Sequence, residues 1–126
     1  MTRRRKEPKP DTRAPEEKVK ADVLVALVLL GCIAIRTNAG KAKRGAYWFQ
    51  LAPKGTSDIC ACAPDGRFVA VETKAPKGGP TPEQRKFLSD VLVRGGIAIV
   101  AHSAEEFVSE WDRQYFKARM PRPGRA

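Results

Sequence analysis

Three charged side chains near the middle of the chain have the types and the spacing of a metal-dependent hydrolytic site. Glu72 and Lys74 are two residues apart at the end of an apolar run, so on a strand they lie on the same face. Asp58 begins the preceding apolar run, and Asp65-Gly66 between the two runs predicts a hairpin turn. The hairpin brings Asp58 beside Glu72, because the two residues lie almost equally far from the turn.

Two carboxylates that converge on one point favour a hard divalent cation. Mg²⁺ prefers oxygen ligands and keeps several waters, and the carbonyl of Thr73 could supply a further oxygen. Lys74 beside such an ion could orient or help deprotonate a water, or stabilise the charge of the phosphorane. The competing interpretation is structural: Asp58 caps a turn, while Glu72 and Lys74 pair at a solvated strand end. The order of the surrounding elements favours the metal site.

The first elements that must position these residues are a helix and a strand. A helix is predicted from Pro15, which suits a first helical position, through Leu30. Its second half is apolar on all sides, which predicts deep burial. Residues 32–36 are predicted to form a strand, followed by a basic loop over 38–45 and a short strand over 47–49.

The hairpin strands are predicted over 58–62 and 68–72. Thr81-Pro82-Glu83-Gln84 has the pattern of a helix start, and that helix is expected to end near Arg94. An apolar strand over 97–101 and a last helix over 104–117 follow. The order α-β-β-β-α-β-α predicts an α/β fold with a mixed sheet flanked by helices.

The composition limits the class of protein. The chain has 126 residues, the size of one domain, and its net charge of +10 implies a polyanionic partner, with nucleic acid ahead of an anionic membrane surface. Its longest uncharged apolar run, residues 23–35, is too short to cross a bilayer, and the first residues lack a secretory signal. The three cysteines are expected to be reduced core residues rather than zinc ligands: Cys32, Cys60 and Cys62.

The positive charge is concentrated at the two ends. Residues 1–13 have a net charge of +4, residues 113–126 have +5, and the part between them has +1. Both ends also contain prolines, which predicts mobile basic arms. The expected organisation is therefore a basic arm over 1–14, a folded domain over 15–117 and a basic tail over 118–126.

The ordered motifs resemble the VRR-NUC (virus-type replication-repair nuclease) domain of the PD-(D/E)xK nuclease superfamily. The resemblance covers about residues 15–102 and rests on the following stretches: 36–40, 55–59, 65–67, 71–74, 81–87 and 95–96. It implies a restriction-endonuclease-like αβββαβ core, here with a C-terminal helix added. It also implies metal-dependent cleavage of DNA, with Asp58 and Glu72 as metal ligands, Lys74 as the catalytic lysine and Mg²⁺ as the ion. Mn²⁺ is expected to substitute.

The resemblance also implies a supporting glutamate on the first helix and a glutamine on the helix after the hairpin. Glu16 fits the first role best, with Glu17 as the alternative, and Gln84 matches the second. Ser57 stands where the family usually has a proline, a position that is not a ligand. Thr73 lies between the glutamate and the lysine and is expected to use only its backbone.

Several basic residues after the first strand are expected to contact phosphate, and the alternative is a solvated loop. They are Arg36, Asn38, Lys41, Lys43 and Arg44. The aromatic residues at 47–49 could stack on bases, but consecutive aromatics on a strand more often divide between core and surface. His102 is expected to be structural.

The resulting hypothesis is a Mg²⁺-dependent DNA nuclease of phage type, structure-selective, with a role in replication or repair. It would act in the cytoplasm, that of the host if the chain is phage-encoded, and exonuclease and endonuclease action both stay open. One alternative is a non-catalytic basic protein that binds nucleic acid. Another is a Holliday-junction resolvase-type endonuclease of the same fold, whose symmetric cutting would need a homodimer.

Overall fold

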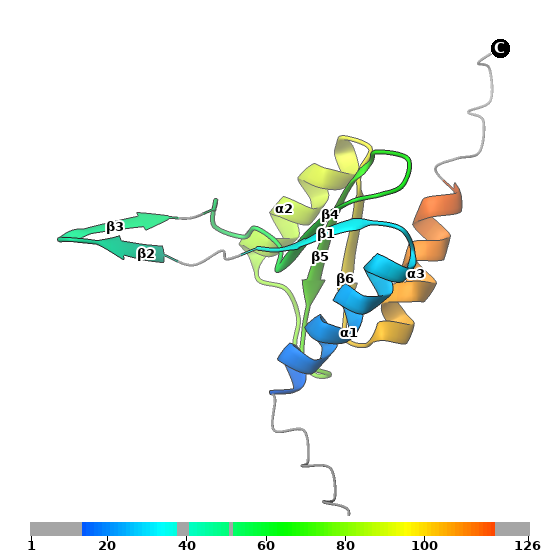
Figure 1. Ribbon diagram of the computed structural model, residues 1–126, viewed down its shortest axis with the longest axis horizontal. Helices are drawn as coiled ribbons and strands as arrows, with labels where there is room; N and C mark the ends of the chain where they lie inside the picture. Colours follow the sequence, from blue (N-terminus) through cyan, green and yellow to red (C-terminus); the bar gives the residue numbers. More distant parts are fainter. Residues whose placement is uncertain (1–13, 38–40, 51, 118–126) are drawn as a thin grey trace, which may run out of the picture.

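Four strands form the central sheet, in the order β1-β4-β5-β6 (Figure 1). β1 (Ile33–Arg36) lies at one edge and pairs antiparallel with β4 (Ile59–Cys62). β4 pairs antiparallel with β5 (Phe68–Thr73), and β5 pairs parallel with β6 (Ile97–Ala101). This mixed sheet confirms the predicted α/β class. The computed structural model describes residues 14–37, 41–50 and 52–117, so Asn38 and the two arms, apart from Ala14, lie outside the described residues.

The hairpin of β4 and β5 has the predicted turn and register. Ile59 pairs with Val71 and Cys62 with Phe68 across the turn at residues 64–67. Continued by one residue, this register places Asp58 opposite Glu72. The pairing confirms the predicted hairpin, which is local in sequence and set by its turn.

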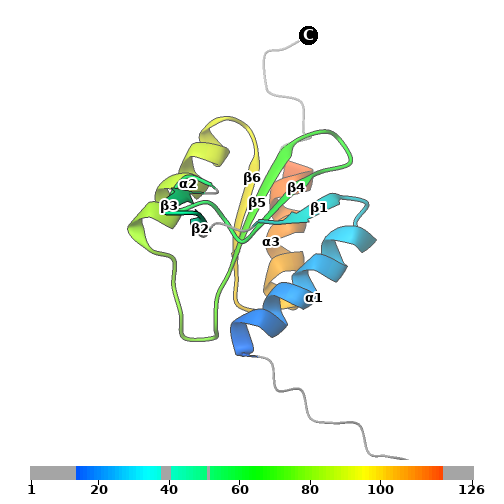
Figure 2. The same cartoon turned by 60° about the vertical axis from the view of Figure 1, so that its left-hand side comes forward.

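The three helices of the described residues cover the two faces of the sheet (Figure 2). α1 (Pro15–Leu29) and α3 (Ala104–Lys117) pack on one face, where Phe107 of α3 is fully buried in the larger apolar cluster. α2 (Pro82–Val93) packs on the other face, where Leu88 and Val91 contact the β5–β6 half of the sheet. The core order α1-β1-β4-β5-α2-β6-α3 is the predicted αβββαβ core with an added C-terminal helix. Within the described residues, no helix is long and apolar enough to cross a bilayer.

The second half of α1 is not deeply buried, contrary to the prediction. Val23 and Leu27 are fully buried, but Val28 is 64% exposed and Leu29 is 81% exposed. One side of the helix packs on the sheet and α3, and the opposite side has no further layer of described residues over it. Because the second half of the helix is apolar on all sides, the sequence predicted burial on all sides. In the fold, α1 has only one buried face.

The cysteines also differ from the prediction of three core residues. All three are free thiols, but only Cys32 is buried, while Cys60 is half-buried and Cys62 is exposed. Cys60 and Cys62 alternate with the buried Ala61 and so lie on the face that carries α2. Because α2 packs over β5 and β6, it leaves the β4 part of that face uncovered.

An additional two-stranded ribbon, β2 (Lys41–Arg44) and β3 (Tyr47–Gln50), interrupts the predicted core between β1 and β4. It forms a sheet of its own and extends away from the main sheet (Figure 1). The predicted strand at 47–49 is confirmed, but residues 41–44 form a strand rather than the predicted loop. Gly45, at φ 64°, occupies the first position of the two-residue turn, where a type II′ hairpin needs this conformation.

Candidate metal centre

Three carboxylates from three separate segments of the chain converge at one end of the sheet. Glu16 lies in the first turn of α1, Asp58 immediately precedes β4, and Glu72 is the penultimate residue of β5. One oxygen of each lies within 4.8 Å of the others. The structure thus brings together the two proposed metal ligands and the favoured helix glutamate.

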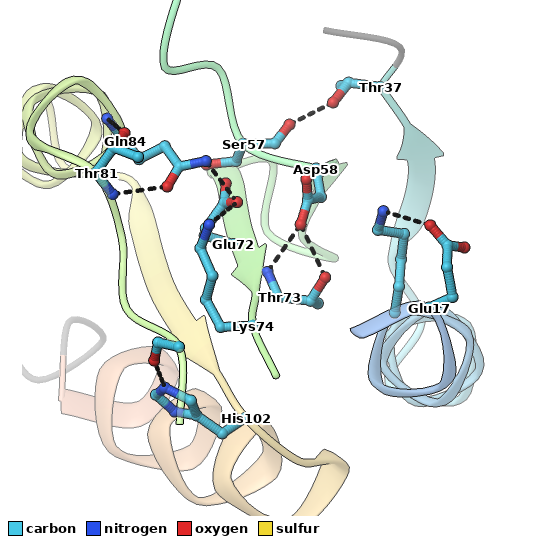
Figure 3. Close-up of polar contacts among 12 residues, drawn as sticks. Glu17, Thr37, Ser57, Asp58, Glu72, Thr73, Lys74, Thr81, Gln84 and His102 are labelled. Carbon is cyan, nitrogen blue, oxygen red and sulfur yellow. Dashed lines mark hydrogen bonds and ion pairs between the residues drawn. The ribbon is translucent and has the colours of Figure 1, made fainter. Parts of the chain in front are cut away.

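The Asp58 side chain is held by the strand beside it (Figure 3). Its Oδ2 accepts hydrogen bonds from the Thr73 backbone N–H at 3.1 Å and from the Thr73 hydroxyl at 2.8 Å. Its peptide carbonyl accepts from the backbone N–H of Thr37 at 2.9 Å. The expectation that Thr73 uses only its backbone is therefore wrong, because its hydroxyl also orients Asp58. No sequence pattern predicts this contact, because it forms only when β4 and β5 pair.

Glu72 is buried, with 1% of its side chain exposed. Its Oε1 accepts a hydrogen bond from Gln84 Nε2 at 2.9 Å and lies 3.4 Å from Lys74 Nζ. Its Oε2 is also buried and has no hydrogen-bond partner in the structure. Burial, and then the negative charge of Asp58, raise the pKa of Glu72 to about 7, against the opposing effect of Lys74.

Gln84 links the start of α2 to this carboxylate. Its backbone N–H donates to the Thr81 hydroxyl at 3.2 Å, and its Oε1 accepts from the Thr81 backbone N–H at 2.8 Å. This is the predicted capping box, and it fixes the side chain so that Nε2 is free to donate to Glu72. The loop before Asp58 packs on the same turn: a Cβ added at Gly55 would lie 2.3 Å from the Glu83 carbonyl oxygen.

The residues at this site fit a divalent cation. The three carboxylates converge within 4.8 Å, and among the described residues Lys74 makes the ion pair with the most buried of them. Like charges at this separation repel each other, and the buried Oε2 of Glu72 lacks the partner that buried polar atoms normally have. A hard cation bound by these oxygens would offset the repulsion and give the Oε2 of Glu72 a partner.

Glu17, the alternative helix glutamate, belongs to a different network. Its carboxylate accepts from Lys20 at 3.1 Å, and its two oxygens accept from Arg36 at 3.0 and 2.8 Å. The hydrogen bond from Lys20, with support from Arg36, lowers the pKa of Glu17. The Arg36 side chain, which was expected to contact phosphate, is thereby paired on the α1 side of β1, although it stays 57% exposed.

The other predicted residues are on other elements or outside the described part. Lys41, Lys43 and Arg44 are all on β2 of the ribbon. His102 joins two segments, with Nδ1 2.9 Å from Glu106 Oε1 and Nε2 2.8 Å from the Gly78 carbonyl oxygen. This is the structural type of contact that was expected of it.

A cavity of about 640 Å³ lies away from the carboxylates. Its lining includes Gly66 and Phe68 from the turn end of the β4–β5 hairpin and Val91 and Gly95 from the end of α2. These residues are at the opposite end of β5 from Glu72. The site with the chemistry is therefore the carboxylate cluster and not this cavity.

The element order and the sheet define a restriction-endonuclease-like α/β fold. Among solved structures, the chain is similar to one titled "VRR_NUC domain", with a TM-score of 0.58 and 20% sequence identity. The similarity covers 82% of this chain and 99% of that chain, so the protein has the fold of a VRR_NUC domain. Neither the protein-family models nor the curated proteins compared with the sequence match it.

Proposed function

We propose that this protein is a metal-dependent nuclease that hydrolyses phosphodiester bonds in DNA. The observation that carries the proposal is the convergence of Glu16, Asp58 and Glu72 within 4.8 Å, with Lys74 beside them. The buried, unpartnered Oε2 of Glu72 supports a cation there. The likeness in fold to a chain titled "VRR_NUC domain" supports the reaction class.

In this proposal Asp58 and Glu72 hold Mg²⁺ or Mn²⁺, with Glu16 beside them and the Thr73 carbonyl as a further oxygen. The bound ion supplies Lewis-acid stabilisation of the charge that develops on the phosphodiester. Thr73 keeps the Asp58 carboxylate in place through its two hydrogen bonds, and Gln84 does the same for Glu72. Both positioning contacts restrict the carboxylates before any ligand arrives, which reduces the cost of ordering them on binding.

In this proposal Lys74 is the side chain that acts on the substrate or on the attacking water. Its side chain is 14% exposed, so its ammonium group is partly desolvated, and it lies 3.4 Å from Glu72 Oε1. From this position it can donate hydrogen bonds to a phosphate oxygen or orient the attacking water. Either contact stabilises the negative charge of the phosphorane.

DNA would be held mainly through phosphate contacts. The proposed contacts come from the basic residues of β2, from Arg36 and Asn38, and from the basic arms 1–14 and 118–126 beside the folded domain 15–117. The substrate is proposed to be structured DNA met in replication or repair, in the cytoplasm of a phage host. The carboxylate cluster would then bind the metal ion, and the basic segments would bind the phosphates of DNA.

A junction-resolving endonuclease that acts as a homodimer is the second candidate. The observation that favours it is exposed apolar surface on α1 and on the edge strand β1, where Leu29 is 81% and Ile33 is 71% exposed. A second copy of this chain could cover it with a two-fold contact and bring two sites to one junction. The mass of the protein in solution, for the parent and for Leu29→Glu, tests this: a parent monomer contradicts the dimer.

Cleavage of labelled linear, flapped and four-way junction DNA tests the proposed function. The parent is expected to cut at least one substrate with Mg²⁺ or Mn²⁺, and Glu72→Gln is expected to lose this activity. Glu17→Gln is the matched control, since Glu17 is a neighbouring glutamate outside the cluster. No cleavage by the parent with either ion would contradict the proposal, as would full activity of Glu72→Gln. Salt-sensitive binding without any cleavage would favour the non-catalytic alternative.

Metal binding can be measured without activity. Mn²⁺ or Mg²⁺ is expected to raise the Tm of the parent in proportion to the logarithm of the ion concentration above its Kd. The same titration should leave Glu72→Gln nearly unchanged and should raise the Tm of Glu17→Gln as in the parent. Equal shifts for the parent and Glu72→Gln would place the ion elsewhere.

A further inference from the structure

Two buried side-chain oxygens in the described part of the chain have no hydrogen-bond partner. One is the Oε2 of Glu72, and the other is the hydroxyl Oγ of Ser57. Ser57 is fully buried, with 0% of the residue exposed. A hydroxyl buried in this way gives up the hydrogen bonds that it makes with water in the unfolded chain, which destabilises the fold. The proposed cation gives the Glu72 oxygen a partner, but the Ser57 hydroxyl still needs one.

Ser57 is held beside the carboxylates by the residues on both sides of it in the chain. Two residues earlier, Gly55 packs against the first turn of α2, the turn that also contains Gln84. The next residue is Asp58 of the carboxylate cluster. The Ser57 side chain points toward Gln84 and the Glu72 carboxylate (Figure 3). The unpartnered hydroxyl is therefore directed into the metal centre.

The polar groups around Ser57 make their hydrogen bonds with other partners. Gln84 Nε2 donates to Glu72 Oε1 at 2.9 Å, and Gln84 Oε1 accepts from the Thr81 backbone N–H at 2.8 Å. The Thr37 hydroxyl donates to the backbone carbonyl of Ser57 and not to its side chain. Since no described group of the protein pairs with the Ser57 hydroxyl, a ligand of the site is the source of its partner.

A water bound to the proposed cation has the chemistry that this hydroxyl needs. Mg²⁺ gives up its waters reluctantly and keeps several of them when it binds to carboxylates. A bound cation makes its waters more acidic, and therefore better hydrogen-bond donors. A serine hydroxyl can accept such a hydrogen bond. A direct bond from the hydroxyl to the ion would instead displace one of the waters that the ion retains, so contact through a water is favoured.

We infer that Ser57 is a positioning residue of the metal centre, whose hydroxyl binds a water of the cation held by Asp58 and Glu72. The inference rests on the proposed function for the presence of the ion. The hydroxyl strengthens the binding of the ion, but it lowers the stability of the ion-free protein because it is then buried without a protein partner. A purely structural hydroxyl would have the opposite effect on the ion-free protein and none on the ion.

Ser57→Ala tests the inference through stability and ion binding, without DNA. The Tm of the full chain is measured in EDTA and over a range of Mn²⁺ and of Mg²⁺ concentrations. In EDTA the Tm of the variant is expected to equal or exceed that of the parent, because the substitution removes a buried polar atom that has no protein partner. The Kd of the ion, obtained from the rise of the Tm with ion concentration, should be about tenfold higher than in the parent.

Ser109→Ala is the matched control, because it makes the same substitution at an exposed position of α3. It should leave the Tm in EDTA and the Kd of the ion unchanged. Cleavage of DNA gives an independent measurement. Ser57→Ala should need about tenfold more Mn²⁺ to reach half of its maximal rate, while its rate at saturating Mn²⁺ stays within about threefold of the parent.

Equal Kd values for the parent and Ser57→Ala would overturn the inference, as would a lower Tm or a loss of folding of Ser57→Ala in EDTA. A parent whose Tm responds to neither ion would overturn it together with the proposed metal centre. A parent that binds the ion more tightly than Ser57→Ala but cuts no DNA refutes only the proposed nuclease function. A parent that cuts DNA, with the same Kd for the ion as Ser57→Ala, refutes only the role of Ser57.

Discussion

The carboxylate cluster and the β2–β3 ribbon differ in charge and in their place in the sheet topology. The cluster collects three acidic residues at the end of the main sheet, and side-chain hydrogen bonds from Thr73 and Gln84 fix two of them. The ribbon has three basic residues and no acid, and its strands pair only with each other among the described residues. The acidic cluster and the basic ribbon are thus separate in the fold, and Thr37, which precedes the ribbon in the chain, donates a backbone hydrogen bond to the Asp58 carbonyl.

The net charge of +10 therefore does not describe the surroundings of the carboxylate cluster. A negative cluster repels the phosphates of DNA unless a cation lies between them, whereas the basic residues of the ribbon and of the two ends are proposed to attract DNA at any metal concentration. Cleavage should therefore depend on the cluster and binding on the basic segments. The following variants test that separation, in order of decreasing effect.

Asp58→Asn should have the largest effect. Loss of one carboxylate at the cluster is expected to reduce cleavage about 10³-fold or more. Affinity for single-stranded DNA in EDTA should stay within about twofold, because phosphate binding depends on cationic side chains elsewhere. Cleavage rates and binding isotherms on the same preparation measure both. A variant that loses binding and cleavage together would show that the two regions are not separate.

Lys74→Ala should come next, with a loss of about 100-fold in cleavage, since one positioned charge near the phosphorane is removed. Single-turnover rates at saturating DNA measure the effect on the chemical step. The Tm shift with Mn²⁺ should persist, because Lys74 is not a ligand in the proposal. Lys86→Ala, which removes a lysine that is 79% exposed on α2, is the control and should cut at the parent rate.

Removal of residues 1–13 and 118–126 should weaken DNA binding about tenfold at physiological salt and flatten its dependence on salt. For each phosphate that the protein no longer neutralises, the slope of log K against log salt becomes shallower by about 0.9 on duplex DNA. Metal-dependent cleavage at low salt should be retained, because the cluster lies within the remaining residues. An unchanged salt slope after truncation would place the phosphate contacts on the folded domain alone.

Thr73→Val should reduce cleavage about tenfold by removing the hydroxyl that donates to Asp58 at 2.8 Å, while its shape is kept. Thr73→Ser should restore most of the activity, because it keeps the donor. Rates measured over a range of Mn²⁺ concentrations are informative here, since a misplaced Asp58 raises the concentration of ion required. Equal activity of the Val and Ser variants would show that the hydroxyl has no positioning role.

His102→Ala should have the smallest effect, confined to stability. Hydrogen bonds to Glu106 and to the Gly78 carbonyl raise the pKa of His102 above its usual 6.5, so its protonated form stabilises the fold. This contribution is present below pH 6.5 and is lost as the pH rises through the raised folded-state pKa. The variant should lower the Tm at pH 6 by an amount equivalent to less than about 1 kcal/mol, and by less at pH 9. A larger loss at pH 9 than at pH 6 would contradict this account.

Much of the site could be predicted because its determinants are local. The turn at Asp65-Gly66 and the alternation of β4 and β5 set which residue lies opposite Glu72, and a two-residue spacing puts Lys74 on the same face. The capping box of α2 likewise involves residues three apart in sequence, so the pattern alone places Gln84 at the start of that helix. Short-range pairing of this kind needs no knowledge of the distant chain.

Other features depend on contacts between distant segments, which composition does not specify. A helix turns about 100° per residue, so the packing of α1 on the sheet decides that Glu16, and not Glu17, reaches the cluster. The same packing leaves Leu29 exposed despite its apolar neighbours, because one face of the helix is enough to cover the sheet.

By itself, then, the sequence determined the α/β class, the β4–β5 hairpin and the carboxylate–lysine pattern, because turn geometry and strand alternation act over a few residues. Tertiary structure alone decided the partner of the Thr73 hydroxyl, the choice between the two helix glutamates and the existence of a separate ribbon. These features depend on which surfaces of the helices and strands pack together in the folded chain. The free energy of that packing comes from contacts between residues far apart in sequence.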